Sequence, residues 1–324
     1  MHELETYQLA IIATGAIAFG IYLLVKGGDW TVDSAVTVAD RSGLSKVFIA
    51  ATIIAFGTSA PELFTSINAN LSGYPGISVG NVFGSNIANV LMVLGISALV
   101  APIAVRRELV RVDVAVMIAA TAAMVPAVLS GILPRWGGLA MVLALAGYIF
   151  YQHRASKLDV DEAEPDTKQK APVPMLLAGI ATLLIGSELL VQGAVAGGLA
   201  LGVPEAVIGM TMIAFGTSLP ELTTCVTAAR KGESGMVVGG ILGSNIFNIL
   251  SVMAISAIAK PLFIDGRFLA IDLPIVGLVT VVLAAILQTR RRIGRRTGGL
   301  MALGYLVFVA FQYGGATSTL TSSL

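Results

Sequence analysis

The chain has 324 residues, of which 56% are hydrophobic and only 12% are charged, and its mean hydropathy is +0.88. Soluble domains carry about 25% charged residues, so this composition excludes an ordinary soluble protein. The net charge of +1 gives no indication of a nucleic-acid partner. The single cysteine, Cys225, excludes an intrachain disulfide.

Apolar runs of about 18 or more residues recur along the chain, and each can cross about 30 Å of hydrocarbon. The first run, residues 9–25, follows acidic Glu3 and Glu5 instead of basic residues, so we interpret it as a retained span and not as a cleaved signal peptide. The pattern predicts ten membrane spans, near residues 8–26, 46–71, 77–101, 111–131, 136–152, 173–199, 204–229, 235–259, 269–288 and 298–315.

The longest polar stretch, "HRASKLDVDEAEPDTKQKAP", lies between the fifth and sixth predicted spans. Its Pro, Lys, Asp and Glu content predicts a solvated cytoplasmic linker. We therefore expect three parts: a first five-helix repeat over 1–152, the linker over 153–172 and a second five-helix repeat over 173–324.

Two phrases occur once in each half of the chain. "AFGTSAPELFTS" (55–66) matches "AFGTSLPELTTC" (214–225), and "GNVFGSNIANVL" (80–91) matches "GGILGSNIFNIL" (239–250). Both pairs lie 159 residues apart, without a gap between the phrases. Agreement of two phrases at one spacing indicates an internal duplication.

The basic residues predict the orientation. Of the 20 Lys and Arg residues, 17 fall in one set of alternating loops, and only Arg135, Lys260 and Arg267 fall in the other. The positive-inside rule places the rich set in the cytoplasm and both termini outside a cell (inner) membrane. Because five spans is an odd number, the second repeat must be inverted relative to the first, as in many secondary transporters.

Each copy of the first phrase has a glutamate deep in an apolar span, Glu62 and Glu221. A carboxylate inside a bilayer costs several kcal/mol, so it is expected to face a cavity or a cation. The alternative is a protonated glutamate that only hydrogen bonds a neighbouring helix. Two equivalent glutamates in one repeated phrase favour the functional interpretation.

The neighbouring residues supply more oxygen atoms. Hydroxyl side chains precede each glutamate by four and three residues, on one helical face, and the proline before each glutamate opens the turn and frees carbonyls. This predicts a site of hard oxygen ligands that suits Ca²⁺ and could serve Na⁺, whereas transition metals prefer His or Cys. The residues are Thr58, Ser59, Thr217 and Ser218, with the carbonyls of 55–58 and 214–217.

The second phrase adds candidate partners, Ser85 and Asn89 in one copy and Ser244 and Asn248 in the other. Alone, such residues are as consistent with helix packing, but their fixed spacing from the glutamates favours ligation. Gly84 and Gly243 would let these helices approach the glutamate helices. Asp29 and Glu188 also match between the repeats, and we expect an interfacial or helix-pairing role for them.

At these phrases the chain resembles the cation/calcium antiporter superfamily and, within it, the prokaryotic sodium/calcium exchangers. The resemblance covers essentially the whole chain. It implies an all-α membrane protein of ten transmembrane helices, built as two inverted five-helix repeats with four cation sites at the midplane.

The resemblance also implies a role for each motif residue. Glu62 and Glu221 would hold Ca²⁺ together with the Thr58 and Thr217 carbonyls. Two Na⁺ sites would flank it, and their implied ligands are Thr58, Ser59, Ser85 and the Ala55 carbonyl for one, and Thr217, Ser218, Ser244 and the Ala214 carbonyl for the other.

One position departs from the family pattern. Members often have an aspartate where this chain has Asn248, so the pair Asn89 and Asn248 supplies neither charge nor a titrating proton. The proton-driven branch of the family has an acidic residue in its second phrase. The asparagines therefore favour Na⁺ coupling over H⁺ coupling.

The sequence thus predicts an antiporter that exchanges Na⁺ for Ca²⁺ by alternating access and normally exports Ca²⁺. A Ca²⁺/H⁺ antiporter of the same fold is the alternative. A passive channel does not explain buried paired carboxylates in an inverted repeat, and an intramembrane hydrolase would need a nucleophile–base pair or a histidine metal motif. We expect no enzyme activity, no cofactor besides the transported ions and no obligate protein partner.

Overall fold

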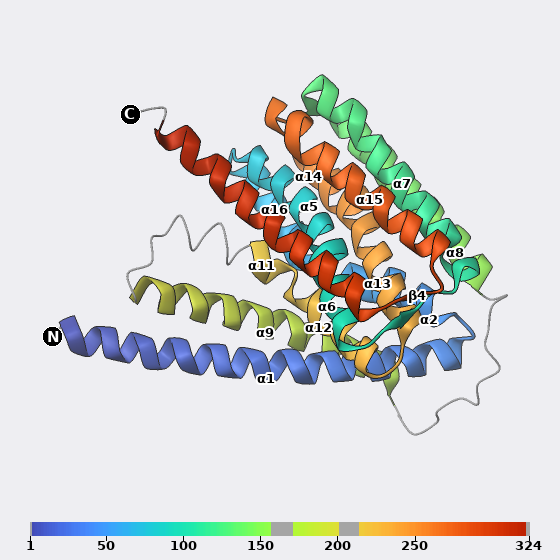
Figure 1. The fold of residues 1–324 in the computed structure, drawn as a ribbon, viewed down its shortest axis with the longest axis horizontal. Helices are drawn as coiled ribbons and strands as arrows, with labels where there is room; N and C mark the ends of the chain where they lie inside the picture. The colour runs from blue at the N-terminus through green and yellow to red at the C-terminus, as the bar shows by residue number, and fades with distance from the viewer. Residues whose placement is uncertain (1, 157–170, 201–213, 322–324) are drawn as a thin grey trace.

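A computed structural model describes residues 2–156, 171–200 and 214–321, which are almost entirely helical (Figure 1). Residues 157–170 of the predicted linker and the start of the seventh predicted span lie outside these residues. The described ends of the predicted linker differ from the prediction, since 153–156 continue helix α8 and Pro172 begins helix α9. The elements of the first half are α1 (His2–Ser42), α2 (Lys46–Ile49), π-helical η1 (Ala50–Ile54), α3 (Ala55–Thr58), α4 (Ala60–Leu71), α5 (Pro75–Ala88), π-helical η2 (Asn89–Val93), α6 (Leu94–Val100), β1 (Ile103–Ala104), α7 (Arg107–Ser130), β2 (Ile132–Leu133) and α8 (Arg135–Ser156).

The second half follows a matching order. Its elements are α9 (Pro172–Ala200), α11 (Ala214–Thr217), α12 (Leu219–Arg230), α13 (Ser234–Phe247), π-helical η4 (Asn248–Met253), α14 (Ala254–Ala259), β3 (Leu262–Phe263), π-helical η5 (Phe268–Asp272), α15 (Leu273–Thr289), β4 (Arg292–Ile293) and α16 (Arg295–Thr321). The π-helical turns recur beside the repeated phrases, and such turns are frequent at functional sites.

Helices coincide with the predicted spans wherever the structure describes them in full. Within those residues, six helices are long and apolar enough to cross a membrane, and the bent pair Lys46–Thr58 and Ala60–Leu71 would make a seventh. The count of ten spans stays a prediction. The first predicted span, 8–26, was too short, because helix α1 continues past residue 26 to Ser42.

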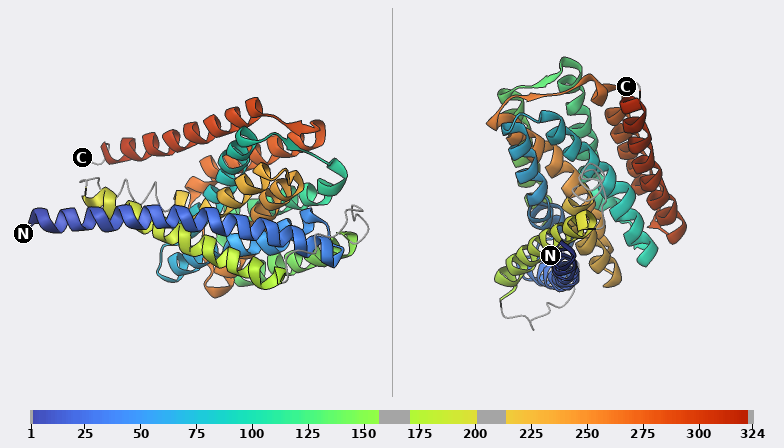
Figure 2. Two further views of the ribbon diagram at one scale, coloured as in Figure 1. Left: turned by 90° about the horizontal axis from the view of Figure 1, so that it is seen from below. Right: turned by 90° about the vertical axis from the view of Figure 1, so that its left-hand side faces the viewer.

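The helices α1 and α9 lie side by side along one flank of the molecule (Figures 1 and 2). Glycines make this contact close. A Cβ atom on Gly27 would lie 2.8 Å from the Leu183 amide nitrogen, and one on Gly186 would lie 2.9 Å from the Gly20 carbonyl oxygen. The beginning of α1 and the end of α16 lie at the same end of the molecule, as an even number of crossings requires.

Two short strand pairs join the halves. The all-α prediction did not include these strands. Strand β1 pairs with β4, and β2 pairs with β3, both antiparallel. These extended segments follow the ends of helices, where the backbone groups that lose helical partners bond each other instead. Strand β3 lies 159 residues after β1, so it is the equivalent segment of the second half. Each of the two strand pairs therefore joins a segment of one half to a segment of the other, and the two pairs are related by the repeat.

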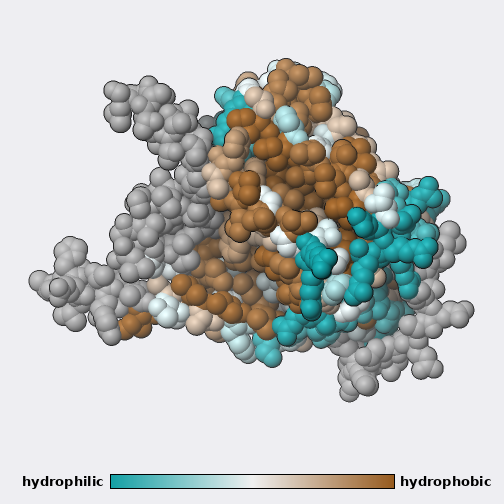
Figure 3. Space-filling model, in the orientation of Figure 1, coloured by the Kyte–Doolittle hydropathy of each residue, from teal (hydrophilic) through white to brown (hydrophobic). Residues whose placement is uncertain are grey.

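Loops that were predicted to share a side of the membrane contact each other. At one end, Lys46 forms an ion pair with Glu233 at 2.9 Å, and Arg107 donates to the Thr289 carbonyl. At the other end, Arg135 donates to the Ala259 carbonyl. In Figure 3 hydrophilic residues gather toward the end where Figure 1 labels β4 and α2, and apolar residues cover much of the remaining visible face.

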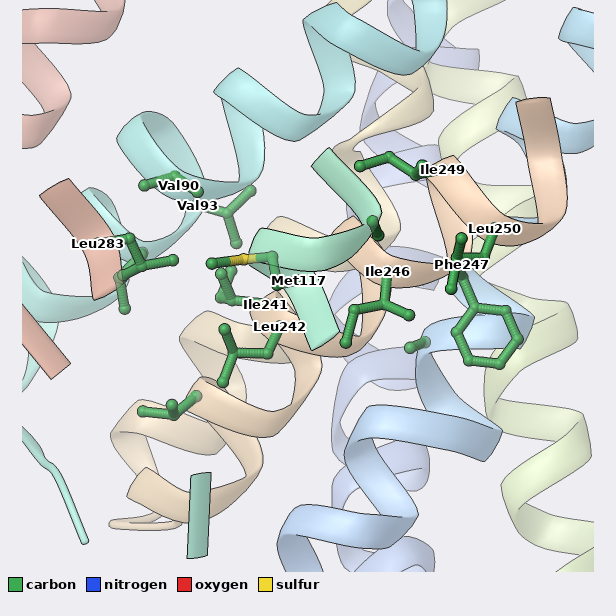
Figure 4. Close-up of a cluster of buried hydrophobic side chains, with 14 of the residues drawn as sticks. Val90, Val93, Met117, Ile241, Leu242, Ile246, Phe247, Ile249, Leu250 and Leu283 are labelled. Atoms are coloured by element: carbon green, nitrogen blue, oxygen red, sulfur yellow. The ribbon is translucent and has the colours of Figure 1, made fainter. Parts of the chain in front are cut away.

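The core lies where the two halves meet. Met117 of α7 lies among Ile241, Leu242 and Ile246 of α13, with Val93 of η2 beside them (Figure 4). All of these side chains are buried. This apolar packing fixes α13 and η2, the elements that carry the second repeated phrases, in the middle of the molecule.

Candidate cation-binding site

Each copy of the first repeated phrase forms a broken helix, and its glutamate lies just after the break. Helix α3 ends at Thr58, α4 begins at Ala60, and the two segments meet at an angle of 43°. Pro61 and Glu62 both lie in the first turn of α4, as Pro220 and Glu221 do in α12. Proline is tolerated there because its missing amide hydrogen has no helical partner to lose. The positive end of the helix dipole favours a carboxylate at this position.

The break has nearly the same geometry in both halves. Ser59 has φ −80° and ψ 7°, and Ser218 has φ −89° and ψ 4°. The Ser59 amide donates to the Ala55 carbonyl at 3.0 Å, and the Ser218 amide donates to Phe215 at 3.2 Å. The Ala55 carbonyl also accepts a long hydrogen bond from Thr58 Oγ1 at 3.4 Å, and a cation at this carbonyl would replace that second bond. Ala214 occupies the matching place at the start of α11.

The two glutamates are buried and face groups from both halves. Glu62 is 1% exposed and Glu221 is 4% exposed. Ser59 of the first half donates to Glu221 Oε1 at 3.3 Å, and Ser85 donates to Glu62 Oε1 at 3.5 Å. Both carboxylates are therefore removed from water. Two buried negative charges call for a cation between or beside them.

A cavity adjoins Glu221 and brings together residues from both repeats. It offers about 10 Å³ to a water-sized sphere, room for one small bare ion or one water molecule. Its polar lining includes Thr58, Ser244 and Glu221, and Ala55 also lines it. Ser244 reaches this cavity because α13 of the second half packs against η1 and α3 of the first. The expected grouping of Ser85 with Thr58 and Ala55 around one Na⁺ stays a prediction.

Close helix contact explains how α13 reaches this position. A Cβ atom on Gly243 would lie 2.6 Å from the Ala51 Cα and 2.7 Å from the Ala51 carbonyl carbon. Only a glycine lets α13 come so near to η1, as predicted for Gly243. The position that corresponds to Ala51 in the second half is residue 210, which lies outside the described residues, so the prediction for Gly84 is not tested.

The asparagines form a symmetric network that the sequence analysis found only in part. Asn89 Nδ2 donates to Asn245 Oδ1, and Asn248 Nδ2 donates to Asn86 Oδ1, both at 3.1 Å. The sequence analysis did not single out Asn86 and Asn245, although each directly follows a serine that it named. Because the amide nitrogens are engaged, the Oδ1 atoms of Asn89 and Asn248 point away from these bonds and have no protein partner.

The site therefore contains a set of buried oxygen atoms that have no hydrogen-bond partner among the described residues. Native structures satisfy nearly all buried polar atoms, so such a set points to a ligand. It suits a hard cation such as Ca²⁺ or Na⁺. Among the residues with described side chains, His, Cys, Asp and Glu form no group of three or more. The unpaired atoms are Glu62 Oε2, Glu221 Oε2, Asn89 Oδ1, Asn248 Oδ1, Thr217 Oγ1 and Ser218 Oγ.

Asp113 and Asp272 form a second matched pair of buried acids, which the sequence analysis missed. They also lie 159 residues apart, and this shared spacing was the available signal. Tyr148 and Gln152 of α8 donate to Asp113, and Gln312 of α16 donates to Asp272 at 2.7 Å. They therefore hold α7 and α15 to neighbouring helices and lie apart from the glutamate network.

The matched pair Asp29 and Glu188 lies outside the site. Asp29 and Asp33 of α1 form ion pairs with Lys231, at 3.1 Å and 2.8 Å. Partial burial of the Lys231 ammonium works against its charge, but the two carboxylates outweigh this and raise the pKa of Lys231. Glu188 is exposed and accepts a hydrogen bond from Gln192. The ion pairs tie the end of α1 to the end of α12.

Comparison with known proteins identifies the family of this chain. The family model described as sodium/calcium exchanger protein matches residues 12–154 and 172–314. Inner membrane protein YrbG of Escherichia coli (strain K12) is 31% identical over 316 residues, which cover 94% of this chain and 97% of that protein. Sodium/calcium exchanger MaX1 of Methanosarcina acetivorans is 28% identical over 340 residues, which cover 92% of this chain and 97% of that protein.

A solved structure of the sodium-calcium exchanger NCX_Mj, soaked with zero Na⁺ and Ca²⁺, superposes with a TM-score of 0.83 at 31% identity, covering 94% of this chain and 99% of that one. The agreement extends over nearly the full length of both chains, and the family model matches both halves. This chain is therefore a multi-pass membrane protein that belongs to the sodium/calcium exchanger family.

Proposed function

We propose that this protein is a secondary active antiporter that exchanges Na⁺ for Ca²⁺ by alternating access and normally exports Ca²⁺ from the cell. The observation that carries the proposal is the set of unpartnered oxygens around two buried carboxylates that come from different halves of the chain. A relative, MaX1, is named a sodium/calcium exchanger. We expect both termini outside the inner membrane, with the basic loops in the cytoplasm.

We further propose that ten spans form two inverted five-helix repeats around this site. Two reciprocal pairs of contacts and one contact between equivalent residues support the arrangement. The Asn89–Asn245 bond has its counterpart in Asn248–Asn86, and the β1–β4 pairing has its counterpart in β2–β3. Thr121 contacts its own counterpart, Thr280, at 3.4 Å. Such reciprocal contacts are expected across a two-fold axis in the membrane plane.

The charge of the site supports exchange by competition. Two carboxylates balance one Ca²⁺ or an equal charge of Na⁺, and the asparagines add oxygen ligands without charge. The desolvation cost of unpaired buried carboxylates opposes movement of the unloaded protein. Only loaded states then change sides, and this couples the two ion fluxes.

The contacts suggest how the ions divide the ligands. Ca²⁺ is expected between Glu62 and Glu221, with the Thr58 and Thr217 carbonyls. One Na⁺ site would use the cavity beside Glu221 with Thr58, Ser244 and the Ala55 carbonyl, and the mirrored site near Glu62 would use Thr217, Ser85 and the Ala214 carbonyl. Ser59 and Ser218 would complete the carboxylate surroundings, and Asn89 and Asn248 would hold an ion in the middle.

The coupling ion is tested by measuring Ca²⁺ uptake into proteoliposomes under one imposed gradient at a time. We expect uptake to follow an outward Na⁺ gradient and to persist when a protonophore removes any pH gradient. Liposomes without protein and liposomes with a Glu62→Gln variant provide the controls. Uptake that follows an imposed pH gradient and ignores Na⁺ would establish a Ca²⁺/H⁺ antiporter instead. Uptake that needs no counter-ion would indicate a channel.

A further inference from the structure

Three helical segments line the small cavity beside Glu221. Its lining residues recur about once a turn, from Thr58, Glu221 and Ser244 at one end to Ala50, Ala228 and Met236 at the other. The far end points toward the Lys46–Glu233 ion pair, since Ala50 and Met236 lie in the first turns after those residues. Cys225 lines the cavity between the two ends.

The two repeats differ at one contact beside this cavity. In the first repeat, Asn81 Nδ2 donates to Ser66 Oγ at 2.9 Å and to the Glu62 carbonyl at 3.1 Å. The counterparts of Asn81 and Ser66 in the second repeat are Gly240 and Cys225. Glycine provides no side chain to fill the space, and a Cβ atom there would lie 3.5 Å from Cys225 Sγ. A thiol therefore borders open space where the first repeat has an amide–hydroxyl pair.

The surroundings of Cys225 provide a mixed set of soft and hard ligands. The thiol is buried and forms no disulfide. Its one described hydrogen bond is a long, weak one to the Val237 carbonyl at 4.0 Å. Glu221 precedes Cys225 by one helical turn, so both side chains share a face of α12. Glu221 lines the same cavity, and its Oε2 atom has no partner among the described residues.

We propose that this cavity binds a thiophilic divalent cation such as Cd²⁺ between the Cys225 sulfur and the Glu221 carboxylate. The thiol loses its proton to water as the sulfur–metal bond forms, because the thiolate is the metal ligand. Soft thiolates select such ions over Ca²⁺, which prefers oxygen. The bound ion occupies a carboxylate that exchange requires, so it blocks transport. The binding step stands on the geometry alone, and the block rests on the proposed function.

Cd²⁺ binding is tested on purified protein in detergent by the ultraviolet charge-transfer band of a cadmium–thiolate bond. The wild-type protein is expected to show the band with one Cd²⁺ per chain, and Cys225→Ser is expected to lack it. A matched control, Cys225→Ser with Ser66→Cys, moves the thiol to the equivalent position beside Asn81, where the filled space should prevent the band. Gel filtration establishes that each variant is folded. No band in folded wild-type protein, or an equal band in the control, would overturn the proposal.

Transport provides the second measurement. Cd²⁺ inhibition of Ca²⁺ flux is measured relative to the flux of each variant itself. We expect Cys225→Ser to raise the half-inhibiting Cd²⁺ concentration by about tenfold, since only oxygen ligands remain. Equal inhibition of both proteins would contradict the block through Cys225. A cadmium–thiolate band in a protein without Na⁺-dependent Ca²⁺ flux would support the metal site and refute the proposed function. Na⁺-dependent Ca²⁺ flux in a protein without the band would support the proposed function and refute the metal site.

Discussion

Replacement of either site glutamate by glutamine is expected to abolish Na⁺-dependent Ca²⁺ transport. Glu62 and Glu221 supply both negative charges of the site, and glutamine keeps their shape while it removes one charge. Two unit charges at 4 Å interact by about 4 kcal/mol in protein surroundings of intermediate dielectric, so losing one should weaken Ca²⁺ binding by roughly a hundredfold or more. The measurement is Ca²⁺ flux into proteoliposomes at fixed protein content.

The control for charge loss is Glu108→Gln. Glu108 lies exposed in the first turn of α7 and takes no part in the site, so this variant should transport like the wild type. If Glu62→Gln or Glu221→Gln kept most of the wild-type flux while folded, the carboxylates would not be the ion ligands.

Replacement of Gly243 by alanine is expected to give the second largest effect, on both stability and transport. The added Cβ would lie 2.6 Å from the Ala51 Cα, and a backbone atom cannot yield as a flexible side chain can. Overpacking of this kind costs about 1–3 kcal/mol. It would also push α13 away from η1 and so separate Ser244 from Thr58. A lower thermal unfolding midpoint in detergent and reduced Ca²⁺ flux are the expected results.

Gly147→Ala provides the matched control. Gly147 lies exposed in α8, and a Cβ there would meet no described atom within 4 Å. Since alanine is the better helix former, this variant should be as stable as the wild type. Equal midpoints for Gly243→Ala and the wild type would mean that the helices do not approach as described.

The sequence could identify the two glutamates that the structure buries because duplication marks them twice. A lone Glu62 would have been ambiguous, but Glu221 at the same place in a repeated phrase was not. Proline just before each glutamate also predicted the helix break that the structure places at Ser59 and Ser218. These features are local, since they depend on residues within one helical turn, and local patterns can be read from sequence.

Contacts between the halves could not be predicted in the same way. The family resemblance grouped Thr58 with Ser85, and nothing in the sequence indicated that Ser244 of the other half lines the same cavity as Thr58. Asn86 and Asn245 bond across the repeats, so no spacing within one phrase revealed their role. Asp113 was overlooked because it lies near the edge of an apolar run. Its burial depends on Tyr148 and Gln152 of the next helix.

The helix lengths show the same limit. Hydropathy ends the first span near Lys26, yet α1 continues to Ser42. The continuation is stabilised by contacts from distant segments, including the ion pairs of Asp29 and Asp33 with Lys231. A run of apolar residues predicts which part of a helix can lie in lipid. It does not predict how far the helix continues when other parts of the protein pack against it. Tertiary packing decided the boundary.

Calorimetric titration of the purified protein with Ca²⁺ at a series of Na⁺ concentrations tests most directly whether both ions share one pair of carboxylates. The apparent dissociation constant of Ca²⁺ should rise more steeply than the first power of the Na⁺ concentration, because several Na⁺ ions must leave before Ca²⁺ binds. Binding of Ca²⁺ that is indifferent to saturating Na⁺ would contradict a shared site.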